Sequence, residues 1–448
     1  MESPPRDGQV SAEPTGSALV SRACKLPDCD PRPFLAGRDA PRIYWTSPYG
    51  PEFAGGGTAA RITADGAGGT DRFESVAETA DELFDGMDYD GPEPARPRLF
   101  GGFSFHADHE PAPPWQNFGT GEFVLPRTQL TRADGETWLT VSARDAPAEA
   151  VEAELSDVRD ALAEDPKRPR GDPPGVVATN PTTTREEWAE QVRAAVERID
   201  AGDLQKVTLA QALAVELADE VSIPDVLARL GESYPDCFRF CFEPTPEAAF
   251  FGATPERLAT LRGRTVETDA LAGSVGRGDT PEEDAELEAS IEESEKMAHE
   301  HGLVVETIRE QLAPLSAEVR VEDRRVRKLA TIQHLWTPIE ADLASSGHVL
   351  SIVEALHPTP AVGGLPPEKA LQTIRETETF ARGWYASPVG WFDAEGDGTF
   401  AVGIRSAVTS GESATLFAGN GIVGDSDPDE EYEEVQLKYL PILDELEK

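Results

Sequence analysis

Near the C-terminal end of the sequence, a hydrophobic pattern typical of a strand is followed by one typical of a helix. This junction limits the possible folds more than any other feature. Residues 416–423 are apolar and rich in small side chains, which predicts a buried strand ending in a tight glycine turn. After Pro428, apolar residues recur at spacings of three and four, which predicts an amphipathic helix. They are Tyr432, Val435, Tyr439, Ile442 and Leu446. The segment therefore predicts a strand followed by a helix that packs its apolar face inward.

Charged side chains occupy a second face of this predicted helix. Glu431, Glu434 and Lys438 are spaced three and four residues apart, so they lie on one side of it. Carboxylates, an ammonium group and the backbone amides of a glycine turn are groups that bind an anionic ligand and a hard metal ion. Acid-rich helices are also commonly just solvated, so this face alone leaves both interpretations open.

A glycine pattern in the same segment resembles a dinucleotide-binding fingerprint. Gly419, Gly421 and Gly424 have the spacing G-x-G-x-x-G, which binds a pyrophosphate only inside a strand–turn–helix unit. Here four acidic residues follow almost directly and would repel a pyrophosphate. We therefore exclude a nucleotide site.

The charge balance excludes one class of partner and suggests an environment. Acidic residues outnumber basic residues by 83 to 40, and the formal net charge is −43, so a nucleic-acid partner is excluded. Only eight of the basic residues are lysines, which is typical of halophilic proteins, whose charges are screened over ~3 Å at about 1 M salt. The sequence has no apolar run of about 18 residues and no apolar signal-peptide centre near residue 1. We expect a cytoplasmic protein without a membrane span.

The order of predicted elements indicates an α+β fold. Residues 1–33 predict a flexible N-terminal segment, 34–145 a β-rich half, 146–180 a helix and a linker, and 181–448 a second and more regular half. The predicted helices are 73–87, one that begins with a capping box at Thr184 and Glu187, and one long acidic helix over 281–312. The predicted strands are 42–46, 58–62, 99–105, 122–129, 137–142, 205–211, 238–242, 248–253, 390–392, 399–407 and 414–418. Many antiparallel strands with helices outside them define the class.

Two residues suggest acid–base chemistry. Lys206 lies in an apolar predicted strand, and burial makes a lysine a usable general base because it disfavours the charged form. A lysine at a strand end that reaches water is the alternative. Glu256 follows an apolar strand and a proline turn, and a surface ion pair with Arg257 is its alternative.

Three further residues suggest ligand binding. Glu300 lies on the apolar stripe of a predicted helix, where a carboxylate needs a partner such as a metal ion. Arg405 lies inside an apolar predicted strand, where an arginine usually binds a carboxylate of the protein or of a ligand. His334 either donates to a substrate or completes a hydrogen bond in the core, and both remain open.

Taken together and in order, these motifs resemble the chorismate-utilising enzymes, and among them most closely the isochorismate synthases of the menaquinone branch. The resemblance is dense over residues 185–445 and weaker over 40–145. It rests on Gln205-Lys-Val, Gly252-Ala-Thr-Pro-Glu-Arg, Asp269-Ala-Leu-Ala-Gly-Ser, Ser294-Glu-Lys-x-x-His-Glu-His, Gln333-His-Leu-Trp, His357-Pro-Thr-Pro-Ala, Arg382-Gly-Trp-Tyr, Gly403-Ile-Arg-Ser-Ala and residues 418–438.

The resemblance implies a fold and a reaction. The fold would be a two-layer antiparallel β architecture with helices packed outside, formed from both halves of the chain. Lys206 would activate a water molecule that attacks ring carbon 2 of chorismate, and Glu256 would protonate the hydroxyl leaving carbon 4. Glu300 and Glu434 would hold magnesium. The residues that would bind the substrate are Gly273, Ser274, His334, Ala361, Tyr385, Arg405, Gly419 and Lys438.

Three positions distinguish branches of that family. Aminodeoxychorismate synthases look to carry a lysine at the position of Ala272, and anthranilate synthases a glutamine at that of Lys206. Both, and the salicylate synthases, tend to carry threonine near Ala361. These three differences from the other branches favour isochorismate synthesis, with no obligatory glutaminase subunit. The alternatives are a salicylate synthase, an aminating component, and a non-catalytic scaffold that kept the fold.

Overall fold

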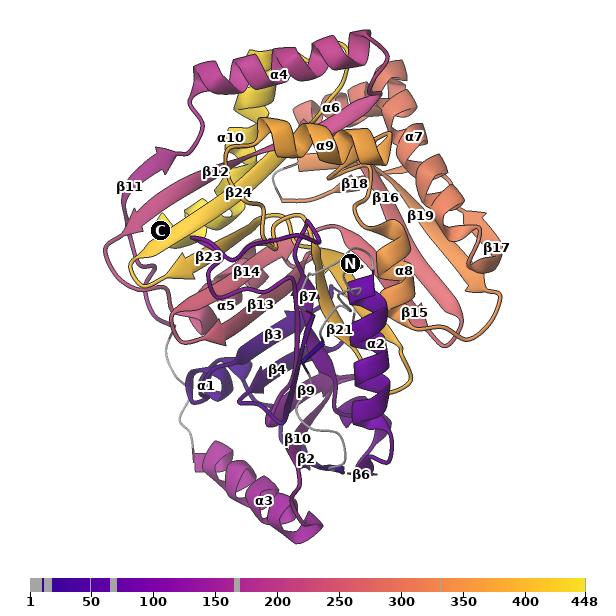
Figure 1. Cartoon of the computed structure of the whole chain (residues 1–448). Helices are drawn as coiled ribbons and strands as arrows, with labels where there is room; N and C mark the ends of the chain where they lie inside the picture. The colour runs from indigo at the N-terminus through magenta and orange to yellow at the C-terminus, as the bar shows by residue number, and fades with distance from the viewer. Residues whose placement is uncertain are drawn as a thin grey trace, which may run out of the picture.

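The computed structural model describes residues 10–11, 18–48, 50–64, 71–164, 170–330 and 332–447. Two large sheets organise this part of the chain (Figure 1). In pairing order, the first sheet contains β11 (Val176–Pro181), β12 (Lys206–Leu217), β24 (Ser413–Ile422), β23 (Ser406–Ser410), β14 (Ala248–Thr254), β13 (Phe238–Thr245), β3 (Arg42–Thr46), β4 (Glu52–Gly56), β9 (Thr128–Ala133), β10 (Glu136–Arg144), β2 (Leu19–Leu26) and β6 (Asp88–Asp90), with β20 (Gly364–Leu365) beside β12. Its strands pair antiparallel except for β2 and β6.

The second sheet is antiparallel throughout. In pairing order it contains β1 (Val10–Ser11), β5 (Ala60–Ala64), β8 (Gly121–Leu125), β7 (Leu99–Phe103), β21 (Pro388–Phe392), β22 (Gly398–Val402), β15 (Arg257–Arg262), β16 (Thr265–Gly276), β19 (Ile332–Leu343) and β17 (Ser316–Val321), with β18 (Arg325–Lys328) beside β19. Strands from both halves of the chain are neighbours in each sheet, because β3 pairs with β13 and β7 pairs with β21.

The two sheets share one apolar core. Phe53 of β4 packs edge-on against Phe100 of β7 and Trp391 of β21, with ring centroids 5.4 Å and 5.3 Å away. Aromatic contacts of this kind join the inner faces of the sheets and bury large areas. The α+β prediction, with two antiparallel layers formed from both halves of the chain, is confirmed.

Helices cover the outside of the sheets (Figure 1). They are α1 (Pro31–Ala36), α2 (Asp71–Phe84), α3 (Ala148–Glu164), α4 (Arg185–Asp200), α5 (Ile223–Ser233), α6 (Pro281–Glu293), α7 (Glu295–Leu312), α8 (Val349–Leu356), α9 (Pro367–Thr377) and α10 (Pro428–Glu447), with a short 3-10 helix at Glu93–Ala95. In Figure 1, α4, α9 and α10 lie at one end of the molecule and α3 at the other. Helix α10 packs on β24 and α7 on β16, which brings both helices to the same region. None of the helices in the described ranges is both long and apolar enough to span a bilayer.

The N-terminal segment is ordered where the sequence predicts flexibility. Strand β2 pairs along its whole length with β10, and α1 begins at the N-cap Asp30. The prediction is therefore wrong over residues 18–33, while 1–9 and 12–17 lie outside the described residues. The polar side chains of β2 find distant partners, Ser142 for Ser21 and Asp88 for Arg22. At the C-terminal end of the predicted helix-and-linker segment, β11 pairs with β12, and residues 165–169 lie outside the described part.

Three long predicted elements are each divided in two. The helix predicted over 281–312 breaks at Ser294, whose hydroxyl accepts a hydrogen bond from the Met297 amide and caps α7. The strand predicted over 399–407 ends at Val402 and resumes at Ser406, because Arg405 takes a φ of 51°. The strand predicted over 122–129 becomes β8 and β9, with Pro126 between them.

Candidate active site

A cavity of about 180 Å³ lies where the ends of β12, β24, β16 and β19 meet α7 and α10. This volume is below the roughly 300 Å³ at which typical drug-sized pockets begin, so the cavity suits a small ligand. Every residue that the sequence analysis assigned to the site lines it. These residues are Lys206, Glu256, Gly273, Ser274, Glu300, His334, Ala361, Tyr385, Arg405, Gly419, Glu434 and Lys438. The structure therefore brings together residues from widely separated parts of the sequence.

Lys206 is the first residue of β12, and only 4% of its surface is exposed. Its ammonium nitrogen lies 2.6 Å from Oε1 of Glu300 on α7. The alternative in which this lysine reaches water is therefore wrong. Lys206 and Glu300 form a largely buried ion pair that faces the cavity.

Glu256 lies between β14 and β15 and is 6% exposed. Burial raises the pKa of its carboxyl from 4.5 to about 7, although Thr359, Arg405 and Lys206 act in the opposite direction. The alternative of an ion pair with Arg257 is wrong, because Arg257 pairs with Glu267 and Asp269. A carboxyl group that holds its proton near neutral pH is suited to act as a general acid.

A second lysine–glutamate pair faces the cavity from α10. Nζ of Lys438 lies 2.8 Å from Oε1 of Glu434 and donates to the Gly419 carbonyl at 3.0 Å. Burial lowers the pKa of Lys438 despite this neighbour. For Glu434, burial acts to raise the pKa, but Lys438 holds it below its ordinary value.

Glu300 and Glu434 reach the same cavity from two helices, α7 and α10. Magnesium prefers oxygen ligands and often takes only one or two protein carboxylates, with substrate and water completing the shell. The described residues contain no ready-made cluster of three or more metal-binding side chains. Two carboxylates that line one cavity fit a magnesium ion whose remaining ligands come from a bound substrate and water.

Ser274 and His334 are cross-strand partners at the ends of β16 and β19. Oγ of Ser274 lies 2.8 Å from Nδ1 of His334. Burial, assisted by Arg405, holds the pKa of His334 well below its ordinary value, so the ring is neutral. Its Nε2 atom is buried and has no hydrogen-bond partner within the described residues, so this nitrogen can serve a ligand.

A β-bulge in β16 sets the direction of the strand end that carries Ser274. The pairing register of β16 with β19 shifts between Ala272 and Ser274, at Gly273. Gly273 takes a φ of +76°, which a residue with a Cβ atom adopts only with strain. Bulges of this kind redirect neighbouring side chains and occur next to active sites.

Arg405 occupies the turn between β22 and β23 and not the interior of a strand, so the predicted placement is wrong. Its guanidinium lines the cavity, and burial lowers its pKa. Within the part of the chain that the structure describes, no carboxylate forms an ion pair with it. An arginine in this state is suited to bind the carboxylate of a ligand.

The remaining predicted residues complete the walls. Tyr385 is buried and stacks on Phe417, with ring centroids 5.3 Å apart. The Ala361 carbonyl accepts a hydrogen bond from the Thr208 hydroxyl at 3.0 Å, and Gly419 pairs with Ala210 of β12. These contacts hold Tyr385, Ala361 and Gly419 in the wall of the cavity.

Sequence reasoning missed Arg382 as a site residue, although it begins a motif used for the resemblance. Its side chain is 1% exposed and forms an ion pair with Glu378, which is 3% exposed. The guanidinium also donates to the carbonyls of Val362 and Thr208 at 2.8 Å and 2.7 Å. The cavity is lined by Arg382, Val362 and Thr208. The Arg382 side chain therefore connects three parts of the cavity wall. An arginine next to the apolar Gly-Trp-Tyr run was the available signal.

Sequence reasoning also placed Glu431 on the charged face of the helix without assigning it a role. Glu431 lines the cavity beside Glu434 and accepts a hydrogen bond from the Asn420 amide at 2.9 Å. Burial raises the pKa of its carboxyl.

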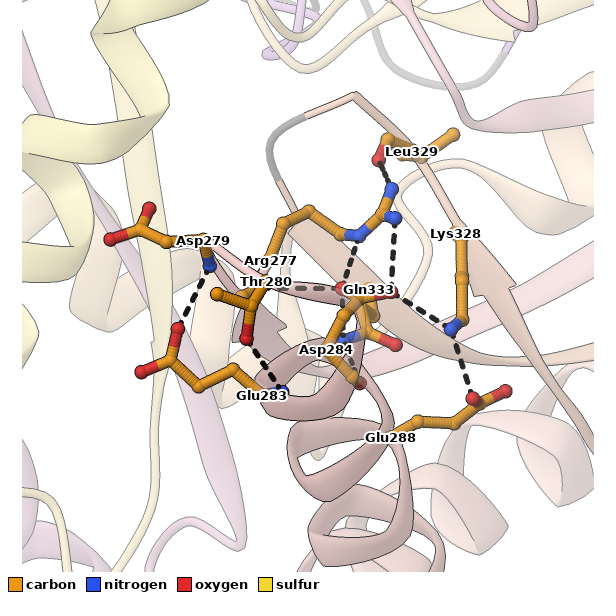
Figure 2. A network of polar contacts seen from close by, with 10 residues as sticks. Arg277, Asp279, Thr280, Glu283, Asp284, Glu288, Lys328, Leu329 and Gln333 are labelled. Atoms are coloured by element: carbon orange, nitrogen blue, oxygen red, sulfur yellow. Dashed lines mark hydrogen bonds and ion pairs between the residues drawn. The ribbon is translucent and has the colours of Figure 1, made fainter.

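A polar network supports the strand end that carries His334 (Figure 2). Asp284 of α6 accepts hydrogen bonds from Arg277 at 2.6 Å, from Lys328 at 2.9 Å and from Gln333 at 3.2 Å. Arg277 follows β16, Lys328 ends β18, and Gln333 precedes His334 in β19. The network therefore joins β18 and α6 to β16 and β19, the two strands whose residues Ser274 and His334 line the cavity.

The chain is similar to known proteins over most of its length. The chorismate binding enzyme family matches residues 9–447. The isochorismate synthase MenF of Bacillus subtilis is 38% identical over 355 residues, which cover 78% of this chain and 74% of that protein. The salicylate biosynthesis isochorismate synthase of Pseudomonas aeruginosa is 37% identical over 440 residues, which cover 96% and 90%.

Solved structures show the same fold. The menaquinone-specific isochorismate synthase MenF of Escherichia coli superposes with a TM-score of 0.81 at 26% identity and covers 97% of this chain and 96% of that one. Anthranilate synthase component I of Streptococcus pneumoniae, at 20% identity, has a TM-score of 0.75 over 89% of this chain and 93% of its own. At that identity the likeness concerns the fold alone.

Proposed function

Because the chain belongs to the chorismate binding enzyme family, we propose that it is an isochorismate synthase that converts chorismate to isochorismate. The observation that carries the proposal is that Lys206 and Glu256 line one small cavity together with an arginine that has no carboxylate partner of its own among the described residues. The Arg-Gly-Trp-Tyr run and the likeness to the E. coli enzyme favour menaquinone biosynthesis as the pathway that uses the product.

The proposed reaction needs a base and an acid in the same cavity. Lys206 takes a proton from the water that attacks ring carbon 2, and Glu256 gives a proton to the hydroxyl that leaves carbon 4. One water molecule is consumed and one is released while the ring double bonds shift. Glu256 has an environment suited to the acid role, since it holds its proton near neutral pH. Lys206 lines the same cavity, where its nitrogen can reach the attacking water.

Other side chains bind and orient the substrate in this proposal. Arg405 and Lys438 bind its carboxylates, and Nε2 of His334 provides a further polar contact. Glu300 and Glu434 would hold magnesium, which when bound draws charge from the ring carboxylate as the double bonds move. Engagement of Glu300 by the metal would also leave the nitrogen of Lys206 free to face the attacking water.

A product assay tests the proposed function directly. The purified chain is incubated with chorismate and magnesium, without a partner subunit, and the products are separated by chromatography. Isochorismate alone is the expected product. Salicylate with pyruvate would move the protein to the salicylate synthases, and anthranilate formed with added ammonia would move it to the aminating branch.

Repeating the assay from dilute buffer to molar potassium chloride tests the halophilic composition, since activity should rise with salt.

The pH profile should report Glu256. The carboxyl must be protonated to act as an acid, and its pKa is raised from 4.5 to about 7, so kcat/KM should fall as the pH rises through about 7. Thr359 lowers this pKa through its hydrogen bond, so in Thr359→Val the alkaline limb should move to higher pH. Steady-state kinetics across the pH range measure the alkaline limb in the wild type and in the variant. A profile that stays flat through about pH 7 would remove Glu256 from the acid role.

Replacement of Glu300 should weaken magnesium binding. Glu300→Gln keeps the size of the side chain but removes the charge, and we expect at least a roughly tenfold rise in the magnesium dissociation constant. Isothermal titration calorimetry of the metal alone measures it. Glu310→Gln is the matched control, because this exposed residue lies on the same helix. Equal magnesium affinity in the two variants would contradict the metal role of Glu300.

A further inference from the structure

Lys206 reaches Glu300 by crossing the neighbouring strand. Thr208 of β12 pairs with Gly421 of β24, and Val207 pairs with Ile422, so Lys206 lies diagonal to Gly421. Diagonal neighbours in antiparallel strands are within reach of a long side chain. The ammonium group of Lys206 then meets Glu300 of α7 at 2.6 Å. The path of the lysine side chain therefore runs over the backbone of Gly421.

The space above Gly421 is filled by this lysine. A Cβ atom placed on Gly421 would lie 2.8 Å from Nζ of Lys206 and closer still to its Cε, while Oε1 of Glu300 would be 3.6 Å away. Non-bonded carbon atoms sit roughly 3.5–4.0 Å apart, so the end of the lysine would have to withdraw by about 1 Å. The missing side chain at position 421 is what allows Lys206 to lie where it does.

Backbone conformation does not explain the glycine. Gly421 lies within the ladder of β24 and is not among the glycines that take a positive φ. A Cβ there meets the far end of a flexible side chain and not a backbone atom. Gly419 differs, because a Cβ on it would lie 2.6 Å from the backbone carbonyl oxygen of Leu209. An alanine at 421 should therefore be compatible with the fold, whereas one at 419 should disturb the pairing of two strands.

We infer that Gly421 is a positioning residue for the reaction, because its bare backbone holds open the path along which Lys206 extends to Glu300. The inference rests on the proposed function, since it assigns Lys206 the role of base. It adds a residue that contributes no reactive group. A displacement of about 1 Å in a reacting group can lower a rate by roughly 100-fold, so the geometry at this glycine matters for turnover.

The test is the variant Gly421→Ala, assayed with chorismate and magnesium. We expect kcat to fall about 100-fold, with KM for chorismate changed less than about twofold and the melting temperature within about 2 °C of the wild type. The separate effects on kcat and KM matter because Gly421 also lines the cavity. A methyl group that merely obstructed the substrate would raise KM and leave kcat unchanged, and this result would overturn the inference.

Gly424→Ala is the matched control in the same segment. A Cβ on Gly424 would meet Ile199 at 3.6 Å and Asp200 at 3.8 Å, which are ordinary contacts, so this variant should keep full activity. A crystal structure of Gly421→Ala supplies the direct measurement: the end of Lys206 should be displaced while Glu256, Arg405 and His334 keep their positions. An unmoved lysine, or full kcat in the variant, would refute the positioning role. Failure of the proposed function is distinguishable, because the wild-type chain would then make no isochorismate.

Discussion

Replacing Lys206 with alanine is expected to abolish turnover of chorismate while the chain still folds. Loss of a general base typically costs about 10²–10⁴-fold in rate. Among the side chains that the structure describes, Lys206 is the lysine that pairs with Glu300. Lys206→Met should be equally inactive, and it keeps the aliphatic part of the side chain that packs over Gly421. Single-turnover kinetics with product separation measure the loss, and circular dichroism checks the fold.

A matched control separates this effect from a general loss of positive charge. Lys369 lies on α9, its side chain is 54% exposed, and it pairs at the surface with Asp203. Lys369→Ala should keep full activity, because exposed ion pairs contribute about 0–1 kcal/mol and lie outside the cavity. If Lys206→Ala turned chorismate over at the wild-type rate, Lys206 would have no part in the reaction.

Replacing Arg382 with alanine should produce the largest loss of stability among these variants. The change leaves the buried carboxylate of Glu378 without its partner, and breaking a buried pair in this way costs about 3–5 kcal/mol. It also removes the donors to the carbonyls of Val362 and Thr208, both of which line the cavity. KM for chorismate should therefore rise together with the fall in stability. Urea unfolding followed by fluorescence measures the free energy of unfolding.

Two further variants make this prediction specific to burial. Arg375 forms an ion pair with Asp108 in which both side chains are at least half exposed, so Arg375→Ala should cost about 0–1 kcal/mol. The double variant Arg382→Met with Glu378→Gln removes both buried charges and should recover much of the lost stability. If Arg382→Ala were no less stable than Arg375→Ala, the buried pair would not support the walls of the cavity.

Elements that depend on local pattern were predictable. The strand predicted over 42–46 has the observed bounds of β3, and the strands predicted over 238–242 and 248–253 form the hairpin of β13 and β14. The capping box at Thr184 and Glu187 is present, and α10 buries four of the five predicted apolar positions. In each case neighbouring residues carry the whole signal, because hydrogen-bonding and burial periods repeat over a few residues.

Elements that depend on a distant partner, or on one residue within a continuous pattern, were missed or drawn too long. The sequence predicts a flexible segment where β2 forms, because the polar residues there have no local partners. Arg22 finds its partner, Asp88, only in the folded chain. The break at Ser294 depends on one side-chain hydroxyl, which interrupts an otherwise continuous helical pattern. The turn at Arg405 depends on one backbone dihedral angle. At β2, tertiary contacts override local propensity.

By itself, the sequence determined the α+β class and the order of the motifs that place the chain in its family. Only the tertiary structure decided that Lys206 pairs with Glu300, that Glu256 is buried deeply enough for its carboxyl to hold a proton near neutral pH, and that Gly421 leaves room for the lysine. The physical reason is that residue type sets which chemistry a side chain can perform. Its protonation, its partner and its reach depend on burial and on neighbours that the chain brings together only by folding.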